Sequence, residues 1–411
     1  MALFLYFIFF STWFFFNYKY HGFNASTFLI SVYWISSVAA IILLYFYQTY
    51  DQEKILFSAV IFHLLCLFLF LAPIIRFGNI DIKRFRIPQF VNLKYFVWGI
   101  IIFSITSLVI SSMKLRTVFS YDDLAQARAL HNLRELYPES KNTIFTYIGG
   151  IGQHFSLLSL FFAFYFFIFY HKKKTLFILL FLSSFAIVIQ NLSIVGRDGI
   201  IRWGLFFIFV YCFFKEDISR DVSKKIRVYF GIGSLPLAAF FIQISEAKFS
   251  GSGKGVFYSL VDYIGQPFIY FSYNFNQFIK GTTGGRMNFP SLYPASEQVS
   301  INNLNDTYYA HYNLNTFSTF VGSFYLDMGL IKTLDVALIF FLLLMLYFRN
   351  NKTYLFSQLI VFIILYEIIL LGIFYYMFTS TEVINTFILT IGISIFLEFK
   401  AKRSSSKKKL N

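Results

Sequence analysis

Residues 155–170 read FSLLSLFFAFYFFIFY, an apolar run that contains two serines and no charged residue. The apolar residues are continuous rather than alternating, whereas strands of a transmembrane barrel need a polar residue at every second position. A helix needs about 20 apolar residues to cross a hydrocarbon core about 30 Å thick. Residues 144–170, which include this run, have that length and therefore predict a transmembrane helix.

Similar apolar runs recur along the whole chain. Only 13% of the residues are charged, against about 25% in soluble domains. The sequence therefore predicts an all-α, polytopic transmembrane helix bundle with about 11 spans, within a range of roughly 10 to 13, in which residues 1–411 form a single integral membrane domain. The predicted spans are 2–16, 26–47, 55–76, 95–113, 144–170, 175–195, 200–214, 228–245, 330–348, 355–378 and 382–399.

The N-terminus and the cysteines exclude several other classes. Residues 2–16 lack a basic n-region and a small-residue cleavage site, so we expect a retained helix and not a signal peptide. Cys66 and Cys212 both lie inside apolar runs, so no disulfide framework or cysteine metal site is predicted. The net charge of +15 comes from residues between the spans, which indicates membrane topology and not nucleic-acid binding.

The basic segments between the spans predict which side each loop faces. Lysine and arginine concentrate in cytoplasmic loops, and the segments that carry them are 76–94, 171–174, 215–227 and the tail 400–411. The span count then places four segments outside, at 114–143, 196–199, 246–316 and 379–381, and the N-terminus outside as well. We expect the basic tail to lie near anionic lipid head groups.

Two of the outward segments are long. In residues 114–143, apolar residues such as Ala127 and Leu130 recur at helical spacing among charges, which predicts an amphipathic helix at the interface. Residues 246–316 form the only long stretch without a spanning apolar run, and we expect a large extracytoplasmic loop that folds as a partly helical cap. A transporter needs only short turns, whereas a membrane enzyme needs a place to hold a water-soluble group. Chemistry is therefore expected in this loop.

The first candidate site is the turn at residues 195–203, VGRDGIIRW, between two predicted spans. It places Arg197 at the outer membrane boundary, where a guanidinium can donate two hydrogen bonds to one phosphate. Two structural alternatives stay open. Asp198 and Arg202 are four residues apart and can form an ion pair on one helix face, and an arginine at a span end can be a snorkelling anchor.

The second candidate is the segment 281–288, GTTGGRMN, in the long loop. Its glycines allow the backbone to approach a ligand closely, and Arg286 again suits a phosphate. The alternative is a loop tip with one basic residue and no function.

The third candidate is the end of the loop, residues 308–329, YYAHYNLNTFSTFVGSFYLDMG. A neutral imidazole such as that of His311 can take a proton from a substrate hydroxyl near pH 7, and Asp327 is a second candidate base. The alternatives are a loop histidine bonded to backbone and an aspartate that caps the following helix. Glu246 and Asp262, which flank the entry to the loop, are further candidate bases.

Other catalytic signatures are absent from the sequence. It contains no HExxH, CxxC, Walker loop, GxSxG or DxD pair, which argues against an energy-coupled pump and a zinc protease. No metal or other cofactor is expected. Glu367 falls within the predicted span 355–378, and a carboxylate buried in the membrane is a functional candidate unless it pairs with Lys332 or a tyrosine.

Three of these features together resemble the O-antigen and oligosaccharide repeat-unit polymerases of bacterial surface polysaccharide synthesis, the Wzy type. They are the GRDG turn at 196–199, the large outward loop late in the chain, and residues 315–329, NTFSTFVGSFYLDMG. The last segment is the most specific, because it ends in aromatic–Leu–Asp–hydrophobe–Gly. The resemblance is best from about residue 190 to 350.

The resemblance implies a metal-independent glycosyltransferase with a polyprenyl-pyrophosphate-linked donor, facing the exterior of the bacterial cytoplasmic (inner) membrane. Such an enzyme moves the growing glycan from undecaprenyl pyrophosphate onto a fresh lipid-linked repeat unit, making O-antigen or capsule. Arg197, Arg286 and Arg202 would bind the pyrophosphate, and His311 or Asp327 would deprotonate the acceptor hydroxyl. The implied partners are the lipid-linked glycan, the bilayer and a chain-length regulator protein, with no nucleic acid.

Two related functions remain as alternatives. An O-antigen ligase shares the architecture and the use of arginine, but transfers the glycan to lipid A core. A flippase or other transporter of lipid-linked oligosaccharides should have short loops and charged residues along its central spans. The long loop and the sparse intramembrane charge argue against the transporter.

Overall fold

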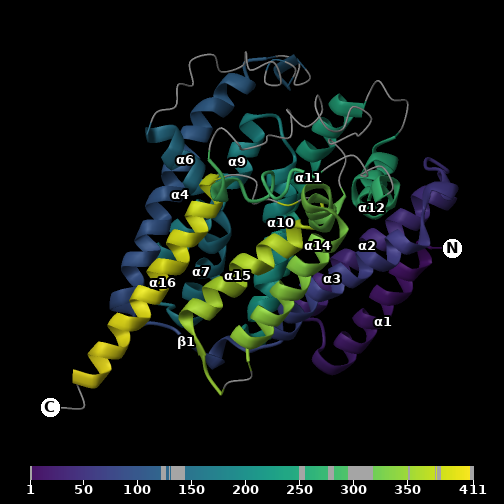
Figure 1. The fold of residues 1–411 in the computed structure, drawn as a ribbon. Coiled ribbons are helices and arrows are strands. Elements are labelled where there is room, and N and C mark those ends of the chain that lie inside the picture. The colour runs from purple at the N-terminus through teal and green to yellow at the C-terminus, as the bar shows by residue number, and fades with distance from the viewer. Residues whose placement is uncertain are drawn as a thin grey trace. The chain divides into compact units, whose positions relative to one another are not determined.

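The structure is a computed structural model in which most of the described residues are helical (Figure 1). It describes residues 2–121, 126–128, 130, 144–249, 255–275, 282–294, 318–349, 352–374, 376 and 381–407. The prediction of an all-α fold is therefore confirmed for this part of the chain.

Each of the eleven predicted spans overlaps at least one helix. The helices are α1 (Phe4–His21), α2 (Ala25–Tyr45), α3 (Phe57–Gly78), α4 (Phe90–Val118), α6 (Ile144–His154), α7 (Ser156–Phe169), α8 (Lys174–Ser183), α9 (Ala186–Ser193), α10 (Asp198–Phe214), α11 (Arg220–Phe249), α12 (Val256–Phe275), α14 (Thr319–Tyr347), α15 (Phe356–Leu371) and α16 (Thr381–Lys407). Two short strands, β1 (Phe85–Arg86) and β2 (Tyr354–Leu355), pair in parallel.

Six helices among the described residues are long and apolar enough to cross a membrane. The bent pair α6 and α7, which turns by 48° at its break, would make a seventh. The chain therefore has the apolar helices of a membrane protein. Shorter elements explain part of the difference from eleven, because the 17 residues of α10 rise only about 26 Å, less than the hydrocarbon core of about 30 Å. The count of eleven spans stays a prediction.

The described contacts divide the chain into two compact units. The first unit comprises Met1–Arg86 and Leu260–Ile391, and the second comprises Ile87–Ser259 and Gly392–Asn411. The single membrane domain expected from the sequence stays a prediction.

In the first unit, α3 packs against α2 and α14, and aromatic rings fill much of the core. The ring of Phe77 stacks on Phe348 at 3.8 Å between centroids. Helix α12 comes close to α2, because a Cβ atom at Gly265 would lie 2.6 Å from the backbone of Ala39. The hydroxyl of Ser36 donates to the carbonyl of Ile264 over 2.5 Å. A helix from the predicted loop 246–316 is therefore packed among the N-terminal helices.

The same predicted loop contains the last residues of α11, all of α12 and the segment 282–294. Helix α14 begins earlier than predicted, at Thr319 rather than at residue 330, and consists of two helices that meet at Gly329. Gly329 has φ +77° and ψ −179°, a conformation that is essentially restricted to glycine. The predicted span 330–348 is therefore the second half of α14.

In the second unit, α4 packs closely against α6 and α9. Gly152 makes this approach possible, because a Cβ atom there would overlap the carbonyl of Phe103. In the predicted amphipathic segment 114–143, Ala127 is buried against Val118 and Val195. Most of that segment lies outside the described residues, so its helical character stays a prediction.

Candidate functional site

The buried carboxylate of Asp327 is the centre of the best-defined polar site in the first unit. Asp327 lies two residues before the break at Gly329, and it is 1% exposed. A carboxylate out of water is costly unless donors surround it. The donors that hydrogen-bond to Asp327 therefore show which part of the chain this carboxylate stabilises.

Four donors from one loop surround this carboxylate. Oδ1 accepts from the backbone N–H groups of Gly285 at 3.0 Å and Met287 at 3.3 Å, and Oδ2 accepts from the N–H of Asn288 at 2.8 Å. The hydroxyl of Thr283 also donates to Oδ1. Because hydrogen bonds to an ionised group are roughly twice as strong as neutral ones, Asp327 fixes the path of this loop. We call residues 282–294 the arginine loop.

Two further hydrogen bonds join the arginine loop to α14. The N–H of Gly284 donates to the carbonyl of Asp327 over 2.8 Å. The side-chain amide of Asn288 donates to the carbonyl of Ser323 over 2.8 Å. The loop is therefore bonded to the backbone of the first half of α14 as well as to the Asp327 side chain.

The glycines of the loop are required by its path. Gly284 has φ +70° and Gly285 has φ +102°, values that strain other residues. A Cβ atom at Gly285 would also lie 3.2 Å from the hydroxyl of Tyr293. The sequence predicted close approach of a ligand to these glycines, whereas in the structure they wrap the backbone around Asp327.

The path of the arginine loop around Asp327 places Arg286 at the surface. Its neighbours Gly285 and Met287 are buried and direct their N–H groups to Asp327, whereas Arg286 itself is exposed. Its guanidinium carbon lies 5.9 Å from the centroid of the Tyr293 ring, within range of a cation–π interaction. The structure thus joins two of the three predicted motifs, the GTTGGRMN segment and the end of residues 315–329.

Asp327 does not act as the simple helix cap that the sequence left open. Its two oxygens accept from the arginine loop, 39 to 44 residues earlier in the chain. His311, the other predicted base, lies outside the described residues, so its position relative to Asp327 stays open.

The predicted turn around Arg197 is in the second unit, between α9 and α10. Val195 has φ +53°, a strained value for a β-branched residue. Arg128 donates from Nη1 to the carbonyl of Val195 over 2.9 Å, and Val195 is buried against Val118 and Ala127. The N–H of Gly196 also donates to the carbonyl of Asn191 over 2.7 Å. Packing and several hydrogen bonds therefore support the turn that presents Arg197, which is half-buried at the start of α10.

Arg202 forms the ion pair that helical spacing allows. Its Nε lies 2.6 Å from Oδ2 of Asp198, one turn earlier in α10. The side chains are 13% and 28% exposed, respectively. Arg202 therefore has a structural partner in α10, and a role in phosphate binding stays a prediction. Arg197 and Arg202 belong to the second unit and Arg286 to the first, so a common pyrophosphate site also stays a prediction.

The other candidate bases have different surroundings. Asp262 accepts a hydrogen bond from the hydroxyl of Tyr50 over 2.7 Å. Burial, followed by this bond, raises the pKa of Tyr50 above its ordinary value. Glu246 lies in α11, and its side chain is outside the described residues. Glu367 is buried in α15 of the first unit.

One buried histidine that is not among the predicted site residues contacts the helix of Asp327. His63 in α3 bonds through Nδ1 to the hydroxyl of Tyr6 at 2.7 Å and through Nε2 to Oγ1 of Thr319 at 2.9 Å. Its ring stacks on Phe271 at 4.0 Å. Thr319 is the first residue of α14 and has φ +63°, a strained backbone conformation. The hydrogen bond with His63 therefore stabilises a strained residue at the start of that helix. A titratable residue inside an apolar run is the signal that indicates such a position.

Among the described residues, no group of three or more His, Cys, Asp or Glu side chains is arranged to hold a metal ion. Comparisons with known proteins found no family model, no curated protein and no solved structure that matches this chain.

Proposed function

We propose that this protein polymerises undecaprenyl-pyrophosphate-linked oligosaccharide repeat units into surface polysaccharide at the outer face of the bacterial cytoplasmic membrane. The observation that carries the proposal is the binding of the arginine loop by Asp327. The segment that most resembles the Wzy-type polymerases, residues 315–329, contains this aspartate two residues before its end. Its carboxylate fixes the loop whose arginine suits a pyrophosphate.

Arg286 is proposed to bind the pyrophosphate of the donor. When the glycosidic bond to the donor breaks, the leaving pyrophosphate gains negative charge, and a cation held in place beforehand stabilises that charge most effectively. Asp327 provides this fixed position through the N–H groups on both sides of Arg286. Asp327 is therefore a positioning residue in this proposal and not the base, because both of its oxygens already accept hydrogen bonds.

The proposed reaction is a glycosyl transfer without a resident metal. The oxygen of the acceptor hydroxyl forms a bond to the anomeric carbon of the donor glycan. The bond from that carbon to the pyrophosphate breaks, and the leaving group keeps the electron pair. The acceptor proton passes to a base, for which His311 is the proposed residue. Arg197 is proposed to contribute a second guanidinium, whereas Arg202 stabilises the start of α10 through Asp198.

The test is the length of surface glycan made by a strain in which the gene is deleted and then restored. A polymerase deletion leaves single capped repeat units and removes the ladder of longer chains on a gel. A ligase deletion instead accumulates lipid-linked polymer, and a flippase deletion removes both products. A ladder of normal length in the deletion strain would contradict the proposed function.

Arginine variants refine this test. Arg286→Ala in the restored gene is expected to remove the ladder, with the protein still present in the membrane fraction at the normal level. Arg116→Ala is the matched control, because Arg116 is also exposed and lies in the predicted outward segment 114–143. A normal ladder with Arg286→Ala would remove Arg286 from the site.

A further inference from the structure

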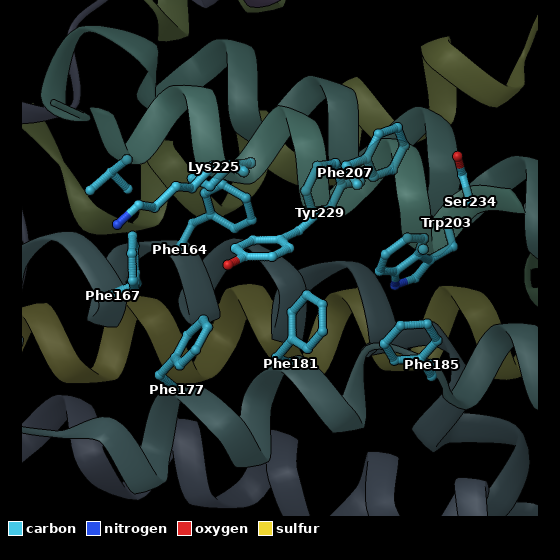
Figure 2. A pocket seen from close by; sticks show the side chains of 14 residues that line it. Phe164, Phe167, Phe177, Phe181, Phe185, Trp203, Phe207, Lys225, Tyr229 and Ser234 are labelled. Carbon is cyan, nitrogen blue, oxygen red and sulfur yellow. The ribbon is translucent and has the colours of Figure 1, made fainter. Parts of the chain in front are cut away.

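The second unit contains an apolar cavity of about 550 Å³ between helices α7, α8, α10 and α11 (Figure 2). Nine of the 14 lining residues are aromatic, so the wall is made mainly of rings. The rings that form much of it belong to Phe164, Phe167, Phe177, Phe181, Trp203 and Phe207. An apolar cavity of this kind does not hold water well and favours an apolar occupant.

One end of the cavity carries a positive charge. Figure 2 shows the Lys225 amine beside Phe167 at one end, with Trp203 and Ser234 at the other. Lys225 is exposed and lies close to the start of α11, and Phe167 lies close to the end of α7. These helix ends adjoin the basic segments 171–174 and 215–227, which the positive-inside rule places in the cytoplasm.

The cavity has the depth of one membrane leaflet. Lys225 and Ser234 are nine residues apart in α11, which corresponds to about 13 Å at the helical rise. Half of the hydrocarbon core is about 15 Å. The volume of about 550 Å³ lies within the range of about 300–1,000 Å³ for ligand pockets, and a depth of about 13 Å accommodates one acyl chain but only part of a long polyprenyl chain.

We propose that this cavity binds one acyl chain of an anionic phospholipid from the cytoplasmic leaflet, with Lys225 beside the lipid phosphate. The aromatic wall matches the hydrocarbon chain, and the charge of Lys225 matches the head group. The site is separate from the proposed glycan chemistry, whose lipid carrier has its head group at the outer face. The protein would bind this phospholipid whether or not it polymerises glycans.

Two glycines of α11 provide a cavity-filling variant and its control. Gly233 lines the cavity, and a Cβ atom built there meets no atom within 4 Å. Gly233→Trp would therefore place an indole in the space meant for the lipid. Gly231 is equally open but is not among the lining residues, and it lies about 200° around the helix from Gly233. Gly231→Trp is the matched control.

The experiment is native mass spectrometry of the purified full-length protein, titrated separately with dioleoylphosphatidylglycerol and dioleoylphosphatidylcholine. We expect one saturable phosphatidylglycerol adduct, bound about fivefold more tightly than phosphatidylcholine, as expected for one lysine near the head group. Gly233→Trp should lose the adduct and Gly231→Trp should keep it. Lys225→Gln should remove the preference for phosphatidylglycerol, whereas Lys224→Gln, a change at the neighbouring exposed lysine, should preserve it.

Three results would overturn the proposal. One is equal binding of the two lipids by the unaltered protein, and another is an unchanged adduct in Gly233→Trp. The third is displacement of phosphatidylglycerol by equimolar undecaprenyl phosphate, which would assign the cavity to the polyprenyl carrier. If Gly233→Trp does not fold, the pair Lys225→Gln and Lys224→Gln decides the question, and identical lipid preference in the two variants would contradict the site.

Discussion

The arginine loop of the first unit and the Arg197 turn of the second unit present the same residue type from a glycine-containing segment, but they are supported differently. One buried carboxylate, Asp327, binds the arginine loop through four donors. The Arg197 turn is instead supported by apolar packing of Val195, by a hydrogen bond from Arg128 and by backbone hydrogen bonds within the turn. Because the arginine loop depends on the single charge of Asp327, one substitution there should disrupt the loop. The Arg197 turn depends on several contacts, so the loss of any one of them should destabilise it only in part.

The largest expected effect is that of Asp327→Asn. The amide nitrogen of asparagine cannot accept from the N–H groups of the loop, and an unsatisfied buried donor costs about 1–3 kcal/mol. We expect the purified protein to lose about 3 kcal/mol of stability and the strain to lose its ladder.

The control for this change is Asp335→Asn, in the exposed part of the same helix. It should leave both the thermal unfolding temperature and the ladder unchanged. If the two variants had the same unfolding temperature and the same ladder, the hydrogen bonds to Asp327 would not contribute more to stability or activity than an exposed carboxylate does.

Glycine substitutions separate strain from crowding within the arginine loop. Gly284→Ala should cost about 1–2 kcal/mol, the expense of a left-handed conformation for alanine, since a Cβ atom there meets nothing within 4 Å. Gly285→Ala should cost more, because its Cβ atom would also crowd Tyr293. Thermal unfolding of both variants measures the difference, and the reverse order would contradict the described path of the loop.

Much of the helical fold follows from the sequence, because continuous apolar runs predict helices from local composition alone. Helix α12 was not predicted as a separate element, since Asp262, Gln266 and Asn274 interrupt its apolar residues. Its packing depends on Gly265 meeting α2, a contact between residues more than 200 positions apart. Local periodicity contains no signal for such a contact.

The candidate site shows the same limit. The sequence indicated both Arg286 and Asp327, yet the bonds between the loop and the aspartate join residues about 40 positions apart. The ion pair of Asp198 and Arg202 was foreseeable because both residues lie on one turn of a helix. The sequence could not supply the four loop donors around Asp327, because none of them is local to it.

A smaller effect on chain length than that of Asp327→Asn is expected for Arg128→Ala in the second unit. The change removes one hydrogen bond to the Val195 carbonyl, worth about 1.5–3 kcal/mol when a charged donor is involved. Apolar contacts still support Val195, so we expect a shortened ladder and not its loss. Complete loss of the ladder at a normal protein level would show that Arg128 has a direct role in the reaction.

The smallest effect is expected for Asp198→Asn. It weakens an ion pair within α10 that is partly exposed to solvent, and such pairs contribute about 0–1 kcal/mol. We expect a shift in thermal unfolding near the limit of measurement and a ladder of nearly normal length. A large fall in chain length without a change in stability would give Asp198 or Arg202 a place in substrate binding.

The coupling of Asp327 to Arg286 is tested most directly by a double-mutant cycle on the polymerisation rate. The purified protein, with a lipid-linked repeat unit as substrate, would be assayed unaltered, with Asp327→Asn, with Arg286→Ala and with both changes. If Asp327 acts by positioning Arg286, the double variant should be no slower than the slower single variant. Rate losses that multiply in the double variant would contradict this coupling and give the two residues independent roles.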